Sequence, residues 1–271
     1  MNVQITYNNS LSKKNRTNKL FFVDESLNIQ PLKKFISSSE YSYISDLLKN
    51  TDNKKKISLF EFSSSQSITL IKLKKSIKNY EIENLGGDFF NFIKGLNKKD
   101  FTINSDIISV KIKNLIGYFL HGVKLKSYKF EKYLTKKEKK NIIITVTGKN
   151  KPSSQDQLRF KSIEDGTFYA RDLVSEPGNV LHPDEYARRI NSLKKIGLKV
   201  NVYDEKKLKK LGMNTLLGVG QGSIRGSYLV TMEWKGKKDN SKPVAFVGKG
   251  VCFDTGGISL KPAKFMEDMT Y

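Results

Sequence analysis

Residues able to carry out chemistry gather in one short segment near the end of the sequence. Lys249 lies between two glycines, Asp254 follows five residues later, and Lys261 follows Asp254 by seven. A carboxylate and two amines delivered by one short segment form a polar cluster of the kind found at functional sites. An Asp–Lys ion pair within a turn is the alternative.

Glycines and an apolar run surround these side chains. The run Val244–Val247 predicts a strand that ends at Gly248, and the pair Gly256-Gly257 follows Asp254 closely. In open α/β sheets, ligands bind beyond the carboxyl ends of strands, and glycines let the backbone approach them. The sequence thus predicts a site in the loop after this strand. A phosphate-binding loop is not supported, because the order G-x-x-x-x-G-K-[ST] is absent.

The elements that must position this loop alternate between strands and helices. Strands are predicted at Val3–Tyr7, Leu20–Val23, Ile57–Phe62, Ile68–Leu73, Phe101–Ile103, Asn141–Thr147, Leu198–Val202 and Tyr228–Trp234. Helices are predicted at Leu32–Leu48, Phe89–Leu96, Ile107–Val123, Ser154–Val174 and Glu205–Leu211, with a further helix starting at Pro183. Apolar residues recur in these runs at alternating or helical spacing. The alternation predicts an α/β fold with helices packed on a sheet.

A polar segment at residues 148–155, which contains Gly, Pro and Ser, is the best candidate for a linker. The excess of basic residues is also larger before this segment than after it. We therefore expect two domains, residues 1–150 and residues 151–271.

The string GKGVCFDTGGISLKP closely resembles the signature of the leucyl aminopeptidase (cytosol aminopeptidase) family. Residues 114–133, 170–187 and 211–236 resemble further family segments in the same order. The resemblance implies a macro-like amino-terminal α/β domain. It also implies, from the linking helix onward, the first part of an α/β metallo-exopeptidase catalytic domain. The expected function is a metal-dependent aminopeptidase that releases amino-terminal, preferably leucine-like, residues from peptides.

The resemblance also implies roles for single residues. By position, Lys249 and Asp254 match metal ligands, Asp254 as the bridge between two ions, and Lys261 matches the catalytic lysine. Two divalent ions, manganese or zinc, would bind the terminal amine and the carbonyl oxygen and activate a water. A protonated Lys261 would stabilise the negative charge that develops on that oxygen.

The family places further acidic ligands and an arginine beyond Tyr271. We therefore expect residues 1–271 to be an amino-terminal fragment that is inactive alone. Asp268 is out of register with the nearest of those ligands and is not assigned a role. The resemblance also implies a homo-hexamer for the full-length protein.

Composition limits the other classes of protein. The chain has 271 residues, of which 38% are hydrophobic, and no apolar run approaches the ~20 residues of a membrane helix. The single cysteine, Cys252, excludes an internal disulfide, and two histidines, His121 and His182, make a histidine-rich zinc site unexpected. The start of the chain lacks the pattern of a signal peptide. We expect a cytoplasmic protein without membrane partners.

The formal net charge of +22 raises an alternative, in which the basic amino-terminal half binds nucleic acid or a nucleotide. Only six of the 49 basic residues are Arg, the residue best suited to bidentate phosphate contacts. Abundant Lys and Asn are typical of an AT-rich genome, which is the simpler explanation. Residues 1–150 also contain no Gly-rich phosphate loop and no alternation of aromatic and basic residues.

Overall fold

The computed structural model describes residues 2–8, 18–49, 55–107, 112–137, 140–237 and 242–269. The chain divides into two compact units, Met1–Tyr169 and Ala170–Tyr271. The longest helix, α4 (Ser154–Ser175), contains the point of division. The domain limits expected from the sequence, 1–150 and 151–271, stay a prediction.

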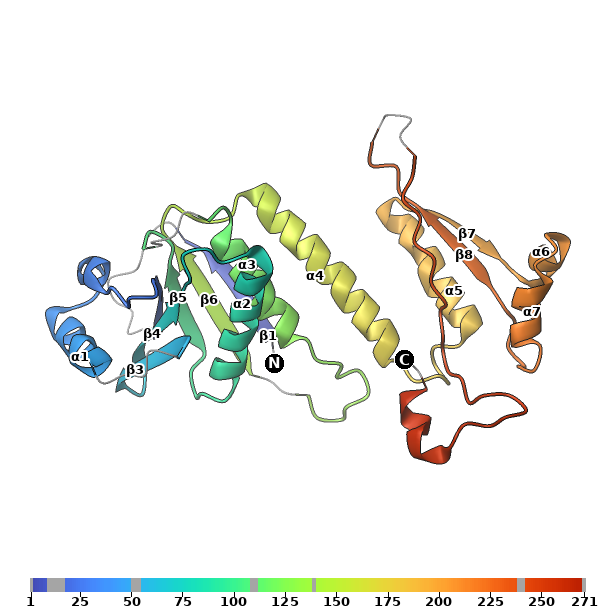
Figure 1. The fold of residues 1–271 in the computed structure, drawn as a ribbon, viewed down its shortest axis with the longest axis horizontal. Helices are drawn as coiled ribbons and strands as arrows, with labels where there is room; N and C mark the ends of the chain where they lie inside the picture. The colour runs from blue at the N-terminus through green and yellow to red at the C-terminus, as the bar shows by residue number, and fades with distance from the viewer. Residues whose placement is uncertain are drawn as a thin grey trace. The chain divides into compact units, whose positions relative to one another are not determined.

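The first unit is built on a six-stranded sheet with the strand order β1-β6-β5-β2-β4-β3 (Figure 1). Its strands are β1 (Asn2–Tyr7), β2 (Asn18–Val23), β3 (Ile57–Ser63), β4 (Gln66–Lys72), β5 (Asp100–Asn104) and β6 (Asn141–Thr147). Every neighbouring pair is parallel except β3 with β4, which is antiparallel. The predicted strand at Asn141–Thr147 is thus confirmed at both ends.

Helices cover both faces of this sheet. They are η1 (Gln30–Lys34), α1 (Ser38–Lys49), α2 (Asn79–Lys94) and α3 (Leu115–Ser127). The residues of β2 show why the sheet needs a layer of helices on each face. Leu20 and Phe22 pack in the core with α2 and α3. Phe21 and Val23 pack on the opposite face with η1 and α1. Successive strand residues point to opposite faces, so a fully apolar strand requires cover on both. The predicted α/β class is confirmed.

Glycines set the packing of α2 against α3. A Cβ atom on Gly86 would collide with the carbonyl oxygen of Phe119, and one on Gly122 would collide with that of Glu83. The two backbones therefore lie in direct contact, which only residues without a side chain permit. This contact explains why α2 runs from Asn79 through Gly86, whereas the sequence predicted a helix only from residue 89 onward.

The second unit begins with the end of α4 and has a small antiparallel sheet of two strands, β7 and β8. Its elements are α5 (Pro183–Asn191), η2 (Ser192–Ile196), β7 (Lys199–Tyr203), α6 (Glu205–Lys210), α7 (Asn214–Gly220), β8 (Leu229–Glu233) and η3 (Ala263–Asp268). Helix α5 packs on β7, and their contact buries Ala187 and Val200. The predicted helix start at Pro183 is confirmed, and His182 caps it by accepting a hydrogen bond from the Glu185 amide.

The predicted strand at Val244–Val247 is wrong. In the structure this run is irregular and pairs with no strand of the described chain. Phe246 and Val247 are 95% and 98% exposed. A strand is stable only when a neighbour satisfies its backbone groups and its side chains are covered, and apolar composition alone supplies neither.

Candidate active site

The three residues singled out by the sequence lie in residues 242–262, a described segment without helix or strand that comes directly before η3. Asp254 and Lys261 are brought into direct contact: the Lys261 Nζ lies 3.4 Å from Asp254 Oδ2. Both side chains are partly exposed. The structure therefore unites a carboxylate and an ammonium group that are seven positions apart in sequence.

A tight turn holds this pair together. The Lys261 amide donates to the Thr255 carbonyl oxygen at 2.9 Å, and Gly256 forms an antiparallel bridge with Leu260. Gly256 has a φ angle of +103°, which glycine adopts without strain and other residues rarely adopt. The glycine after Asp254 is thus required by the turn that returns the chain to Lys261.

Hydrogen bonds also fix the carboxylate of Asp254. The Gly256 amide donates to Asp254 Oδ1 at 2.9 Å, and the Asp254 amide donates to the Met269 carbonyl oxygen at 3.2 Å. The pKa of Asp254 is lowered, first by the bond from Gly256, and then by Lys261 and by the charge of Lys249. The carboxylate is therefore ionised at neutral pH and presents Oδ2 to its surroundings.

Lys249 is placed less directly. Its charge acts on Asp254, yet no hydrogen bond or ion pair of the Lys249 side chain occurs among the described residues. The backbone next to it is fixed by α5: a Cβ atom on Gly250 would lie 2.8 Å from the Tyr186 ring. The structure thus brings Lys249 within electrostatic range of Asp254, without contact between the two side chains.

The loop also packs on the turn that precedes α5. A Cβ atom on Gly178 would lie 2.8 Å from the Cβ of Phe253, so the backbone of this turn and the residue before Asp254 are in close contact. The sequence showed this turn only as a family segment before a helix. Its support of the loop depends on the contact between Gly178 and Phe253, which are 75 positions apart in sequence. No local sequence pattern reveals such a contact.

An ion-pair network anchors that turn to α5. Glu176 is 3% exposed and its Oε1 lies 2.9 Å from Arg189 Nη1. Arg189 also donates to Glu185 at 2.8 Å, and Arg188 binds Glu185 through two further bonds. Hydrogen bonds from Arg188 and Arg189 lower the pKa of Glu185 to about 2. Sequence reasoning missed this network, although acidic and basic residues spaced by three and four positions were a usable signal.

The histidines and the cysteine take structural positions. His121 is buried in the first unit with its Nδ1 2.8 Å from Glu83, and His182 caps α5. Burial raises the pKa of the Cys252 thiol, and the charge of Asp184 raises it further. A thiol held in its protonated form is a poor nucleophile and a poor metal ligand.

The donor types near Asp254 fit a divalent cation in part. A carboxylate and a neutral amine are ligands that zinc and manganese accept. Two donors are fewer than the three protein ligands of a typical catalytic zinc site. In the described part of the chain, no three His, Cys, Asp or Glu side chains are grouped so that they could hold a metal ion.

Comparison with known proteins places this loop in a family. Residues 168–271 match the sequence profile described as "Cytosol aminopeptidase family, catalytic domain". The probable cytosol aminopeptidase of Brucella melitensis is 51% identical over 155 residues, which cover 55% of this chain and 32% of that protein. The probable cytosol aminopeptidase of Nitrobacter winogradskyi is 40% identical over 201 residues, covering 72% and 40%. The matched part of the chain thus spans 32% and 40% of the length of these two relatives.

Solved structures share the fold. A mutant of tomato leucine aminopeptidase superposes with a TM-score of 0.75 at 18% identity, covering 99% of this chain and 57% of that chain. The cytosol aminopeptidase from Coxiella burnetii gives 0.69 at 20% identity, covering 97% and 53%. The bottromycin maturation enzyme BotP in complex with Mn gives 0.70 at 19% identity, covering 94% and 52%. At these identities the likeness establishes the fold.

Proposed function

Since the chain belongs to the cytosol aminopeptidase family, we propose that the protein is a metal-dependent aminopeptidase that hydrolyses amino-terminal residues from peptides. The observation that carries the proposal is the Asp254–Lys261 pair, held by a glycine turn inside the segment that matches the family's catalytic domain. Leucine-like residues are the proposed preference, in keeping with the name of the tomato neighbour.

We assign Lys249 and Asp254 to metal binding, with Asp254 as the bridging ligand. Asp254 is suited to this role because its carboxylate is ionised and Oδ1 is already oriented by the Gly256 amide. Lys249 must lose its proton before its nitrogen can bind a cation. Two bound ions, manganese or zinc, would supply Lewis acidity and a nucleophilic water at neutral pH.

Lys261 is the proposed catalytic residue. Its ammonium group is held beside the Asp254 carboxylate by the hydrogen bond from its own amide to Thr255. From this position it would donate to the carbonyl oxygen of the scissile peptide as negative charge develops there. The loss of one such donor lowers kcat by about 10²–10³-fold.

The proposed partners and location follow the family. Peptides are the substrates, and a homo-hexamer is the proposed assembly. The relatives are named cytosol aminopeptidases, which supports a cytoplasmic location. None of the helices within the described ranges is both long and apolar enough to cross a membrane.

Metal binding by the 271-residue chain tests the assignment without relying on activity. We expect Mn²⁺ titration, followed by electron paramagnetic resonance, to detect weak binding that Asp254→Asn removes. Glu233→Gln, which changes an exposed carboxylate on β8, is the matched control and should bind as the parent chain does. Equal binding by the parent chain and Asp254→Asn would overturn the role of Asp254.

Hydrolysis of leucine p-nitroanilide tests the activity. We expect the 271-residue chain to be inactive, because we assign it two metal ligands and no three His, Cys, Asp or Glu side chains of its described residues are grouped to hold an ion. In the intact protein, Asp254→Ala should abolish metal-dependent turnover. Metal-dependent release of p-nitroaniline by the homogeneous 271-residue chain would refute the first expectation, and near-normal turnover of Asp254→Ala would refute the second.

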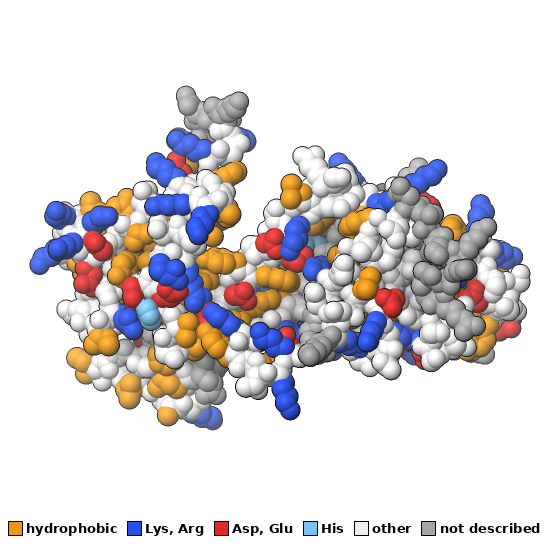
Figure 2. Space-filling model, turned by 180° about the vertical axis from the view of Figure 1, so that it is seen from behind, with side chains coloured by type: hydrophobic (Ala, Val, Ile, Leu, Met, Phe, Trp, Pro, Cys, Tyr) orange, Lys and Arg blue, Asp and Glu red, His pale blue; other side chains and the backbone are white. Residues whose placement is uncertain are grey.

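Nucleic-acid binding by the amino-terminal unit is not favoured as a second function. On the face drawn in Figure 2, Lys and Arg side chains are spread among acidic and apolar ones instead of forming one patch. Neither the site nor the comparisons point to a nucleic acid.

A further inference from the structure

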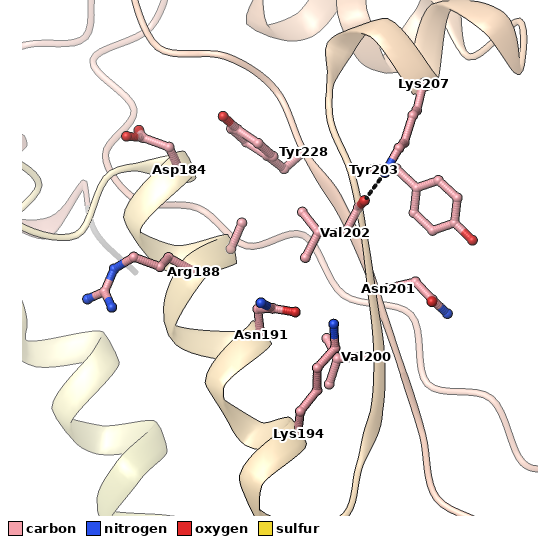
Figure 3. A pocket seen from close by; sticks show the side chains of 11 residues that line it. Asp184, Arg188, Asn191, Lys194, Val200, Asn201, Val202, Tyr203, Lys207 and Tyr228 are labelled. Atoms are coloured by element: carbon pink, nitrogen blue, oxygen red, sulfur yellow. Dashed lines mark hydrogen bonds between the residues drawn. The ribbon is translucent and has the colours of Figure 1, made fainter.

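A cavity of about 580 Å³ lies between α5 and β7 in the second unit, apart from the Asp254–Lys261 pair (Figure 3). Its volume is in the range of ligand-binding sites. Residues from both faces of β7 line it: Val200 and Val202 on the side of α5, and Asn201 and Tyr203 on the other side. Successive strand residues point to opposite faces, so a cavity touched by both sets lies along the edge of the strand.

That edge carries backbone groups without a partner strand. In the described chain β7 pairs with β8 alone, so one of its two edges has no neighbouring strand. One of these groups, the Val202 carbonyl oxygen, accepts a hydrogen bond from Lys207 Nζ at 3.2 Å. Unpaired N–H and C=O groups in a row are a template for an added strand, and this is a known way in which proteins bind extended peptides.

The charges beside this edge indicate which peptide fits. Lys194 approaches from the side of α5, and Lys207 lies on the other side of β7 (Figure 3). Neither lysine has an acidic partner among the described residues. Arg188 points away from β7 and is bound by Glu185, and Asp184 is paired with Arg225. The uncompensated charge along the cavity is therefore positive on both faces of the strand.

We propose that the edge of β7 is a docking site for an extended acidic peptide segment of a partner protein, which adds a strand to β7 and places carboxylates beside Lys194 and Lys207. The five residues of β7 offer about 17 Å of edge, enough for roughly five peptide residues. Backbone pairing provides the orientation, and the two lysines select acidic side chains on alternate faces. This binding needs neither metal nor active site, so it is independent of the aminopeptidase proposal.

Fluorescence anisotropy with the 271-residue chain tests the docking site. The probe is a labelled, end-blocked pentapeptide of sequence Val-Glu-Glu-Val-Glu, with a Val-Lys-Lys-Val-Lys peptide as the charge control. A third peptide carries the acidic sequence with alternate amides N-methylated, which removes backbone donors and keeps the side chains. We expect binding of the first peptide alone.

Matched variants distinguish peptide binding at this site from nonspecific electrostatic attraction to a basic protein. Lys194→Glu with Lys207→Glu should weaken binding roughly tenfold or more, since two surface charge pairs are lost. Lys195→Glu with Lys206→Glu makes the same change of charge at neighbouring exposed residues outside the cavity and should leave the dissociation constant almost unchanged. Equal weakening by both pairs, equal binding of the N-methylated peptide, or no binding of the acidic peptide at low salt would each overturn the proposal.

Discussion

Replacement of Arg189 by methionine is expected to destabilise the second unit strongly. Glu176 is 3% exposed, and its carboxylate lies 2.9 Å from the Arg189 guanidinium. Methionine keeps an unbranched apolar stem but removes the guanidinium group, which leaves a buried carboxylate without this partner. Removal of one partner of a buried ion pair costs about 3–5 kcal/mol, and we expect about 3 kcal/mol because the Arg189 side chain is 20% exposed.

The neighbouring arginine provides the control. Arg188 also binds Glu185, but its side chain is 70% exposed, so Arg188→Met should change stability little. Urea unfolding can be followed by the fluorescence of Trp234, which is the single tryptophan of the chain and lies in the second unit. The free energy of unfolding is compared at constant m-value.

A double-mutant cycle identifies the cause. Glu176→Gln with Arg189→Met should show a coupling free energy above about 1 kcal/mol, whereas Glu176→Gln with Arg188→Met should be additive. If Arg188→Met destabilised the unit as much as Arg189→Met, or if the first pair were additive, the argument from the buried carboxylate would be refuted.

Three further predictions concern packing, pH and catalysis. Gly122→Ala should prevent normal packing of α2 on α3, and circular dichroism should show a large fall in melting temperature. In the control Gly95→Ala, the added Cβ atom has no neighbouring atom within 4 Å, so this variant should melt at the same temperature as the parent chain. The pKa of Glu185 is lowered from 4.5 to about 2 in the folded state, so its stabilising contribution is complete above about pH 4.5 and is lost as the pH falls toward 2. Urea unfolding between pH 2 and 6 should therefore depend less on pH in Glu185→Gln, and an unchanged dependence would contradict this. Lys261→Met in the intact protein should lower kcat about 10²–10³-fold with little change in metal binding, and loss of metal binding would contradict a purely catalytic role.

Local patterns were enough for most regular elements. The run Asn141–Thr147 is rich in β-branched residues, which predicts a strand, and β6 has the same bounds. Ser154–Val174 lacks glycine clusters and proline, and α4 differs from it by one residue. The start of α5 at Pro183 follows from proline at the first turn and the acids after it.

Predictions failed where the outcome depended on a distant partner. The sequence predicted a helix only from Phe89 onward, yet α2 begins at Asn79 and continues through Gly86, where the backbone of α3 packs against it. Val244–Val247 has the composition of a buried strand, yet no strand of the described chain pairs with it. Local sequence gives the preference of a segment for helix or strand. It does not show whether another element lies beside that segment to pair or pack with it.

The same division holds for the candidate active site. The string GKGVCFDTGGISLKP by itself indicated the resemblance to the family and supplied the candidate residues Lys249, Asp254 and Lys261, because both depend on residue types and their spacing. Only the tertiary structure decided that Lys261 contacts Asp254 whereas Lys249 does not, and that the turn at Gly178 and the Tyr186 ring support the loop. Contacts between segments far apart in sequence depend on how the chain packs, and the geometry of a site is made of such contacts.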